Sequence, residues 1–457
     1  MSSMKSPIIG PRTLVLCFDG TDEQFQNTNV IKLFSLLEKD SDEQLVYYQP
    51  GIGTYAAPGV MAGIRKWFAK LADQAVAWYL DIHVMRGSVL PSTFILTCVN
   101  CLNQVMGGYS FLMQNYRQGD RICLIGFSRG AYTARALAGM VHKVKQVGFA
   151  YNIYKQTGKT NVNLATDFRQ TFSKPIPIDF VGCWDTISSV GLLFSKHFPF
   201  TIGNSSIKYF RHALSLDEHR ARFQPNLYHR VSPSAKAARK DPEHSSYPEK
   251  SPTSPGPETD VLEVWFPGCH TDIGGGTTPS PKLGSNTPSL SDITLHWMIR
   301  QMVITQCGVI FNNDSLTAAG IPLSMLSTTA SDKNALIEMR NTDKKVLMDD
   351  DSSSLPSPLY SPAAAKEDAR DAIQPLHDSL KTTPVWWILE IFPFVLSWQD
   401  ESGVWHRDWR WNLGRPRRIY SPVVNLHITV RERMEDESLK YTPRAVWKNK
   451  PDAVWCY

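Results

Sequence analysis

A serine lies at the centre of the pentapeptide Gly126-Phe127-Ser128-Arg129-Gly130, between an apolar stretch and a run of small residues. Residues 121–127 predict a buried strand, and the alanines after them predict a helix that packs closely on a sheet. In a tight turn from strand to helix, only glycine fits two positions before and after the serine, whose hydroxyl is exposed at the helix N-terminus. The pattern predicts a nucleophile, Ser128. The alternative is a strand-turn-helix in which the serine does no chemistry.

A nucleophilic serine needs a base and a group that orients the base. Residues 176–184 form an apolar stretch that leads into Asp185, and residues 261–266 form another that leads into a loop with His270. Because the carboxyl ends of parallel strands share one edge of a sheet, we expect these side chains to meet Ser128 there. The chain order Ser, Asp, His is that of α/β-hydrolases.

These three residue types suit acyl transfer. Ser128 would attack an ester carbonyl, His270 would move the proton to the leaving alcohol, and Asp185 would fix the imidazole tautomer. Asp185 also fits a helix N-cap or a turn, because a threonine follows it. His427 is the nearest rival to His270, but it lies within an alternating stretch, residues 423–430, which predicts a strand that packs it.

The same mechanism needs two N–H donors for the oxyanion. One is expected from the backbone of Arg129 and the other from the loop after an earlier strand. Asp19-Gly20-Thr21 follows the predicted strand 13–18 and is assigned to this loop. Gly20 would let the backbone approach a substrate, and Asp19 would orient the loop through hydrogen bonds to its N–H groups. An ordinary Asp-Gly turn is the alternative.

Further carboxylates are expected at this edge. Asp272 follows His270 by two positions and is assigned either to substrate contacts or to holding the glycine-rich loop 274–276. Asp19, Asp185 and Asp272 could gather around a cation. A serine nucleophile activated by histidine needs no metal ion and no other cofactor, so none is assigned.

Four ordered motifs resemble those of one family. They read FDGT at 18–21, GFSRGAYTAR at 126–135, WDTISSVG at 184–191 and WFPGCHTDIGGG at 265–276. They are similar to an uncharacterised α/β-hydrolase domain family of fungi and bacteria, whose bacterial members include phospholipase effectors of the type VI secretion system. The resemblance covers nearly the whole chain and implies activity on lipid esters through Ser128, Asp185 and His270. Thr277 stands where the family usually has an aromatic residue.

Composition agrees with a large globular enzyme. The chain has 457 residues, of which 42% are hydrophobic and 11% aromatic, enough for one large α/β core with insertions. The formal net charge of +5 is mildly basic and is compatible with peripheral contact with anionic lipid. Arg415, Arg417 and Arg418 are expected on a solvated face. No basic and aromatic pattern indicates nucleic acid.

Cysteine usage and the lack of targeting signals predict a cytoplasmic protein. Cys17, Cys123 and Cys183 lie in apolar strands and predict buried free thiols. Cys98 and Cys101 form a C-x-x-C motif, which without a second such motif is weak evidence for a zinc site. No signal peptide and no run of about 20 apolar residues is found. The most apolar short stretch, 386–396, could lie at a lipid interface, line an acyl pocket or pack on the core.

The predicted fold class is α/β, with an α/β-hydrolase-like, mostly parallel sheet flanked by helices, surface insertions and a C-terminal cap-like region. Strands are expected at 13–18 and 44–49 and before each site residue, and helices at 30–38, 71–82 and 128–142. Residues 1–290 would form the core and 291–457 would complete or cap it. Residues 231–259 and 343–370 are rich in Ser, Pro and charge and predict flexible insertions.

Residues 86–106 interrupt the resemblance. Pro91 and the many threonines and valines oppose a helix, and the dipeptide Val-Met occurs at both 84–85 and 105–106, as if the flanks once met. We interpret the segment as a retained intron read as protein, or a recent insertion, which bulges out and contributes nothing to catalysis. A lipid-facing lid is the alternative.

The sequence therefore predicts a serine hydrolase for carboxylic esters, with lipids preferred. The alternatives are a small-ester or peptide-modifying hydrolase and a catalytically silent scaffold that binds proteins. Labelling of Ser128 by a fluorophosphonate would separate an enzyme from a scaffold.

Overall fold

The computed structural model of the protein describes twelve stretches of the chain. These are residues 11–20, 27–39, 41–51, 92–143, 176–187, 206–229, 258–276, 287–321, 362–400, 403–421, 423–447 and 453–457. The helix expected at 71–82, residues 231–257 of the insertion expected at 231–259, and Thr21 and Thr277 lie outside these stretches.

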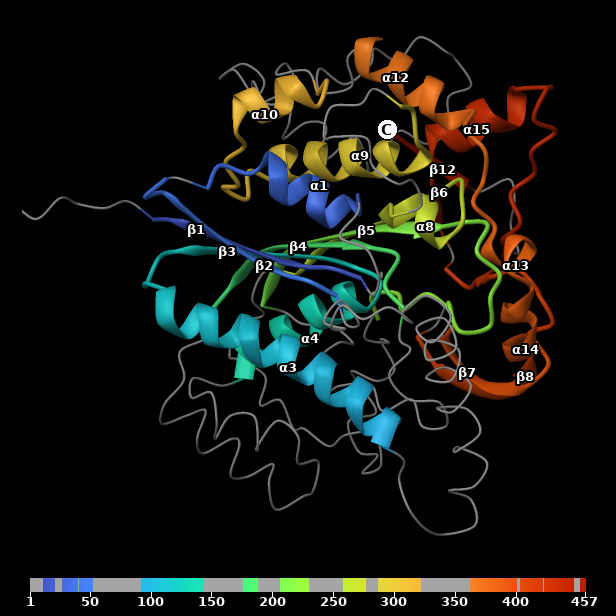
Figure 1. Cartoon of the computed structure of the whole chain (residues 1–457), viewed down its shortest axis with the longest axis horizontal. Coiled ribbons are helices and arrows are strands. Elements are labelled where there is room, and N and C mark those ends of the chain that lie inside the picture. The colour runs from blue at the N-terminus through green and yellow to red at the C-terminus, as the bar shows by residue number, and fades with distance from the viewer. Residues whose placement is uncertain are drawn as a thin grey trace, which may run out of the picture.

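One sheet of eight strands forms the centre of the molecule (Figure 1). Its order is β12-β10-β6-β5-β4-β3-β1-β2, and all neighbouring strands are parallel. The strands are β1 (Thr13–Phe18), β2 (Gln44–Gln49), β3 (Arg121–Phe127), β4 (Ile178–Trp184), β5 (Ile207–Ser215), β6 (Asp260–Phe266), β10 (Val424–His427) and β12 (Ala453–Cys456). The predicted α/β-hydrolase-like fold is confirmed.

Helices cover both faces of this sheet, as an all-parallel sheet requires (Figure 1). On one face lie α3 (Ser92–Asn115) and α4 (Arg129–Lys143); on the other lie α1 (Asn29–Leu36), α8 (His270–Gly274), α9 (Leu290–Ile304) and α10 (Asn313–Ala318). α12 (Pro362–Ala372) packs against both α9 and α15 (Ile428–Glu435).

Four further labelled elements lie at one side of the sheet (Figure 1). They are α13 (Ser379–Thr382), α14 (Trp387–Glu390) and the antiparallel hairpin of β7 (Pro393–Gln399) and β8 (Trp405–Trp411). The described chain also contains a 3-10 helix (Pro384–Trp386) and the short parallel pair β9 (Arg418–Ile419) and β11 (Val446–Trp447).

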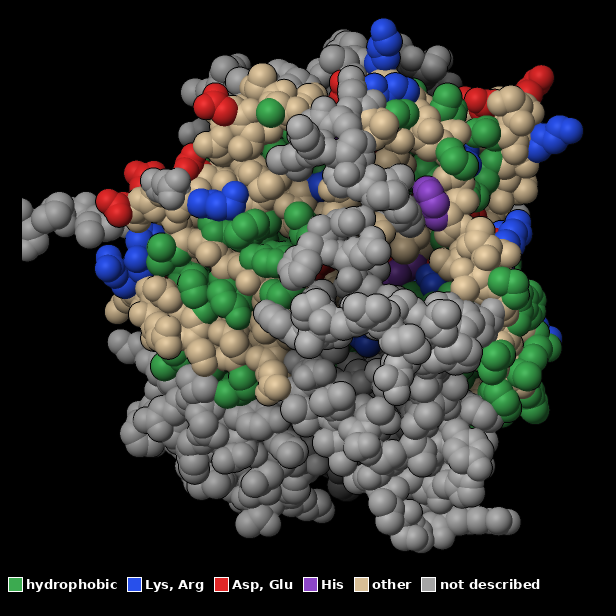
Figure 2. Space-filling model, in the orientation of Figure 1, with side chains coloured by type: hydrophobic (Ala, Val, Ile, Leu, Met, Phe, Trp, Pro, Cys, Tyr) green, Lys and Arg blue, Asp and Glu red, His purple; other side chains and the backbone are tan. Residues whose placement is uncertain are grey.

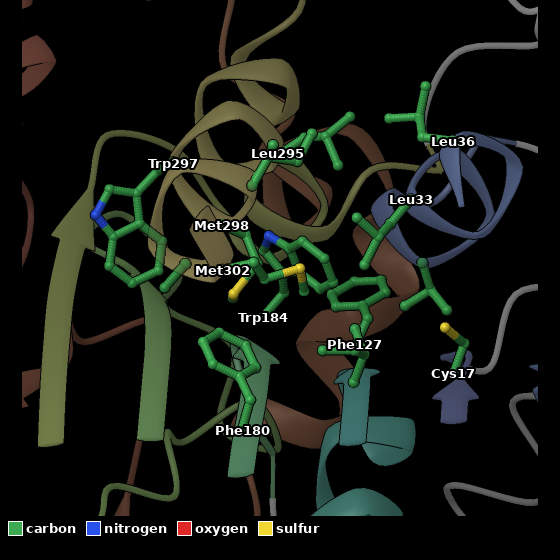
Figure 3. Packing of buried hydrophobic residues seen from close by; sticks show 14 of the residues in the cluster. Cys17, Leu33, Leu36, Phe127, Phe180, Trp184, Leu295, Trp297, Met298 and Met302 are labelled. Carbon is green, nitrogen blue, oxygen red and sulfur yellow. The ribbon is translucent and has the colours of Figure 1, made fainter. Parts of the chain in front are cut away.

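Alternation of side chains along the strands builds a core on each face. In β1, Val15 and Cys17 belong to the core on the side of α1 and α9, while Leu14 and Leu16 belong to the core on the side of α3 and α4. Figure 3 shows Trp184 close to Met298 of α9 and beside Phe127, the last residue of β3.

The three thiols expected in strands, those of Cys17, Cys123 and Cys183, are buried and free, as predicted. The side chains of Cys98 and Cys101 lie outside the described part of the chain.

The direction of the winding changes between β1 and β3. From β1 the chain passes to β2 at the sheet edge, and it later returns to β3 on the other side of β1. At such a point the loops that follow the two strands diverge and leave a crevice, which is where ligands bind in parallel sheets. Ser128 directly follows β3, and Asp19 directly follows β1.

The expectation that residues 86–106 oppose a helix is wrong for residues 92–106, which belong to the continuous helix α3. Pro91 lies outside the described residues, and the helix is described from the next residue, Ser92. Val105 is buried, and the side chain of Gln104 donates to the carbonyl of Pro50 at 2.9 Å. This end of the segment therefore packs as part of the core. Its origin as a retained intron or a recent insertion, and its alternative role as a lid, stay hypotheses.

The expected flexible stretch 343–370 is wrong for residues 362–370, which form most of α12. Pro362 suits the first turn of a helix and the alanines after it favour one. Asp368 of this helix is buried beside Arg300 of α9, with 3.3 Å between the charged atoms. Residues 343–361 lie outside the described part of the chain.

The chain after residue 290 supplies both sheet strands and covering helices. β10 and β12 extend the main sheet beyond β6. The division into 1–290 and 291–457 stays a prediction. Within the described stretches, no helix is both long and apolar enough to cross a membrane.

Candidate active site

Ser128 occupies the turn between β3 and α4 with a φ of 59°, a conformation uncommon for residues other than glycine. A Cβ on Gly126 would lie 2.5 Å from the backbone of Gly130, and one on Gly130 would lie 2.2 Å from the carbonyl oxygen of Phe18. No side chain fits at either position. The two glycines are therefore required by the close approach of β3, α4 and β1, as the pentapeptide predicted.

His270 lies between Ser128 and Asp185. Its Nε2 is 2.9 Å from Oγ of Ser128, and its Nδ1 is 2.6 Å from Oδ2 of Asp185. An ionised carboxylate only accepts, so Nδ1 carries the proton and Nε2 is left to accept the hydroxyl hydrogen of Ser128. The structure thus brings together the three side chains that the sequence placed at one sheet edge.

Three parallel strands position this arrangement. Ser128 follows β3, Asp185 follows the neighbouring β4, and His270 opens α8 after β6. Asp185 has a φ of 37° and its backbone N–H donates to Ala213 of β5 at 2.8 Å. Its side chain contacts His270 and does not cap a helix or close a turn, which was the alternative role.

Both oxygens of the buried Asp185 carboxylate are occupied. Besides His270, they accept hydrogen bonds from the guanidinium of Arg417 at 2.7 and 2.9 Å and from the N–H of Ser215 at 3.1 Å. Burial alone would raise the pKa of Asp185, but the charges and hydrogen bonds of Arg417 and His270 hold it well below its usual range. Arg417, expected on a solvated face, is instead only 1% exposed.

A second buried carboxylate, Glu218, lies beside His270. It accepts the backbone N–H of His270 at 3.2 Å and pairs with Arg220 at 2.7 Å. Burial would raise the pKa of Glu218, but mainly Arg220 lowers it to about 2. Sequence reasoning missed this pair.

Aromatic rings enclose the imidazole. Phe127 lies 4.8 Å and Phe223 4.9 Å from the ring of His270, centroid to centroid. Burial lowers the pKa of His270, and the hydrogen bond and charge of Asp185 oppose that shift without cancelling it. The imidazole is therefore neutral near pH 7, which is the form that a general base needs.

The loop after β1 lies against Ser128. A Cβ on Gly20 would come within 3.3 Å of Cβ of Ser128. Asp19 orients this loop as expected: Oδ1 accepts the N–H of Gly20 at 2.7 Å, and Oδ2 accepts the hydroxyls of Thr28 and Tyr48, each at 2.9 Å. The N–H of Gly20 is therefore directed to Asp19.

Arg129, the other residue assigned to the oxyanion, is the first residue of α4. The backbone N–H groups of a first helical turn point out of the helix end, which here adjoins Ser128. The assignment of Arg129 as an oxyanion donor stays a prediction.

Asp272 holds the loop that carries His270. It accepts the N–H of Cys269 at 2.8 Å, and its Oδ1 lies 2.6 Å from Nδ1 of His377 in the segment between α12 and α13. Asp19, Asp185 and Asp272 thus bind separate partners. In the described stretches, no three His, Cys, Asp or Glu side chains are placed to hold a metal ion.

His212 of β5 is a further polar residue that sequence reasoning missed. Its Nε2 accepts the N–H of Thr186 at 3.0 Å, so its Nδ1 carries the proton that bonds Glu263 at 2.9 Å. The pKa of His212 is lowered by burial. His212 thus holds the backbone of Thr186, the residue after Asp185. The sequence feature that could have indicated this role is the presence of His212 and Glu263 within two otherwise apolar strands.

His427 takes no part in this arrangement. It is buried at the end of β10, and its ring stacks on Phe266 with 4.6 Å between centroids. Its packed role agrees with the sequence, but the strand expected at 423–430 ends at His427, where α15 begins.

A family model described as "T6SS, Phospholipase effector Tle1-like, catalytic domain" matches residues 12–89 and 94–301, which is more than half of the chain. The chain belongs to this family. The match contains Ser128, Asp185 and His270 and is interrupted only within the anomalous segment 86–106. Membership in a phospholipase family supports the coarse class of a hydrolase.

Relatives come from fungi and bacteria, as the motifs predicted. Uncharacterized protein YEL023C of Saccharomyces cerevisiae is 27% identical over 584 aligned residues, covering 97% of this chain and 81% of the yeast protein. The crystal structure of an uncharacterized protein from Pseudomonas aeruginosa is 17% identical with a TM-score of 0.36, and the match covers 83% of this chain and 62% of that one. The Tle1 effector bound to the VgrG spike of the Type 6 secretion system is 15% identical with a TM-score of 0.29, and the match covers 97% and 95% of the two chains.

Proposed function

We propose that this protein is a serine hydrolase that cleaves carboxylic ester bonds of lipids. The observation that carries the proposal is the hydrogen-bonded chain from Oγ of Ser128 through the imidazole of His270 to the carboxylate of Asp185. A neutral imidazole beside a hydroxyl and an ionised carboxylate on its far side form the arrangement that activates a serine nucleophile.

In the proposed reaction, Oγ of Ser128 attacks the ester carbonyl while Nε2 of His270 accepts the hydroxyl proton. The imidazolium is stabilised by Asp185, and it gives the proton to the departing alcohol as the carbonyl–oxygen bond breaks. Water then attacks the acyl-serine with His270 again as the base, which releases the fatty acid and restores Ser128.

The lipid substrate class follows from family membership, since the family is described by its phospholipase effectors. A hydrolase of small esters would share the chemistry and differ in the pocket. A silent scaffold would have no need of a buried carboxylate held ionised beside a histidine, because burying such a charge costs stability.

A fluorophosphonate probe and a lipid panel test this function. The wild-type protein is expected to be labelled at Ser128 and to release fatty acid from phospholipids, because the probe traps the activated hydroxyl. Ser128→Ala should abolish both signals, whereas Ser438→Ala, a change at an exposed serine, should alter neither. Labelling without lipid hydrolysis but with hydrolysis of short esters would identify a small-ester hydrolase. No labelling of folded protein would support the scaffold.

We further propose that the substrate is met at a lipid surface. Apolar side chains gather over α14 and the β7–β8 hairpin (Figure 2). The exposed ones are Trp387, Ile388, Ile391, Trp409 and Trp411, at 45 to 55% exposure. In the apolar stretch 386–396, by contrast, Leu389 and Phe394 pack inward. Tryptophan suits a membrane interface because its ring is apolar and its N–H is polar.

The surroundings of this patch favour an anionic surface. Among the described residues 381–418, which contain the patch, the exposed charged side chains are those of Lys381, Arg407, Arg415 and Arg418, against Asp408. Cations near a membrane attract anionic head groups. Trp386, next to the patch, packs on Phe223, which in turn packs on His270.

Sedimentation with vesicles tests the surface separately from the chemistry. In the Ser128→Ala background, we expect Trp409→Ser with Trp411→Ser to weaken binding to vesicles containing anionic lipid. With Ser128 intact, the same pair of changes should leave hydrolysis of a soluble short-chain ester unchanged. Undiminished vesicle binding by the double variant would refute this surface.

A further inference from the structure

Arg417 reaches the site from a distant part of the chain. It lies in the segment between β8 and β9, whereas the match to the family's catalytic domain ends at residue 301. Its side chain is fully buried against the Asp185 carboxylate. Its backbone is fixed too, because its carbonyl accepts the N–H of Val446 at 2.9 Å.

The guanidinium of Arg417 is completely bonded. Nη1 donates to Oδ1 of Asp185 at 2.7 Å and to the carbonyl of Ser215 at 3.0 Å. Nη2 donates to Oδ2 of Asp185 at 2.9 Å and to the carbonyl of Phe223, to which Nε also donates at 3.1 Å. These bonds use all five N–H donors that an arginine has, and the two parallel ones fix the plane of the carboxylate.

This pairing also balances the buried charge. Two carboxylates, Asp185 and Glu218, and two guanidiniums, Arg417 and Arg220, surround the imidazole of His270. Their charges cancel while the imidazole is neutral, and the group carries one positive charge when His270 holds the proton. Without Arg417, the remaining excess of negative charge would stabilise the protonated imidazole at rest.

We propose that Arg417 is a positioning residue for the reaction: it holds the Asp185 carboxylate in the plane and charge state that orient His270 toward Ser128. The inference rests on the proposed serine hydrolase function and deepens it. It means that the part of the chain matched by the family's catalytic domain lacks one component of the machinery, which the segment between β8 and β9 supplies.

The test compares Arg417→Met and Arg417→Lys with two matched controls in the full chain, Arg117→Met and Arg370→Met. Both controls change exposed arginines that lie outside the candidate site and outside the proposed lipid surface. We expect Arg417→Met to slow fluorophosphonate labelling and to lower kcat for a soluble ester on the order of 10²-fold, with KM little changed, because a small misplacement of the base is enough for such a loss. The controls should match the wild type.

The pH profile gives a readout that a purely structural role would not move. Loss of the positive charge favours protonated His270, so the acidic limb of kcat/KM should move to higher pH in Arg417→Met. In Arg417→Lys, which keeps the charge but not the planar pair of donors, the limb should stay in place while kcat falls.

A double variant shows whether Arg417 acts through Asp185. If it does, Arg417→Met combined with Asp185→Asn is hardly slower than Asp185→Asn alone. Additive losses, or wild-type labelling by Arg417→Met, would overturn the proposal. If Arg417→Met does not fold, Arg417→Lys still tests the proposal. A wild-type kcat for Arg417→Lys would overturn the proposal, and a lowered kcat with the acidic limb of kcat/KM at its wild-type pH would support it. Failure of the wild type to label refutes the proposed function itself.

Discussion

Replacing Ser128 or His270 by alanine is expected to lower turnover by about 10⁴- to 10⁶-fold, and replacing both is expected to be hardly worse. The reason is that the two side chains share one step of the proposed reaction: Oγ would attack only while Nε2, 2.9 Å away, accepts its proton. The measurement is kcat for a soluble ester with each single variant and with the double variant.

His427→Ala is the matched control for the histidine. His427 is as buried as His270 and burial lowers its pKa to about 3, but it packs on Phe266 away from the hydrogen-bonded chain. Its loss should lower thermal stability and leave turnover per folded molecule nearly unchanged. If the effects of Ser128→Ala and His270→Ala simply multiply, the two residues do not act in the same step.

Asp185→Asn should lower kcat by about 10⁴-fold, because an amide cannot hold the imidazole in the tautomer that accepts a proton at Nε2. Asp272→Asn should be much milder. Asp272 also contacts a histidine, but its partners Cys269 and His377 hold the loop and not the reacting atoms. The comparison is made on kcat per folded molecule, with the melting temperature of each variant as the measure of folding.

The relative loss of kcat in these two variants decides between two roles for Asp272. A loss in Asp272→Asn as large as that in Asp185→Asn would mean that Asp272 contacts the substrate or the oxyanion, as the sequence allowed. The pKa of His377 is raised above its ordinary value by Asp272, so this pair stabilises the loop below that raised pKa and loses its strength as pH rises through it.

Much of the fold and the main residues of the site could be predicted from the sequence, because their signals are local. β1, β2 and β3 are apolar runs bounded by polar residues, and the glycines around Ser128 are imposed by the turn itself. Asp185 and His270 could be placed because each directly follows such a run, and parallel strands bring those positions to one edge.

The errors share one cause, which is that burial depends on partners far away in the sequence. Arg417 was assigned to solvent because two other arginines flank it, but its partner Asp185 lies 232 residues earlier. α12 was taken as flexible because of its polar composition, yet Asp368 is buried against Arg300 and His296 of α9. In α3, the buried side chains of Val105, Tyr109 and Leu112 stabilise a helix that its threonines and valines disfavour by propensity.

The separation of the site's parts along the chain has a consequence for how activity arises during folding. Ser128 and His270 are 142 residues apart, and Asp185 and Arg417 are 232 apart. Contacts between such distant residues close large loops and are slow to form. A nascent or truncated chain that stops before residue 417 can therefore build the turn around Ser128 without orienting His270, so under the proposed function full hydrolytic activity is reached only after the C-terminal strands and Arg417 have docked.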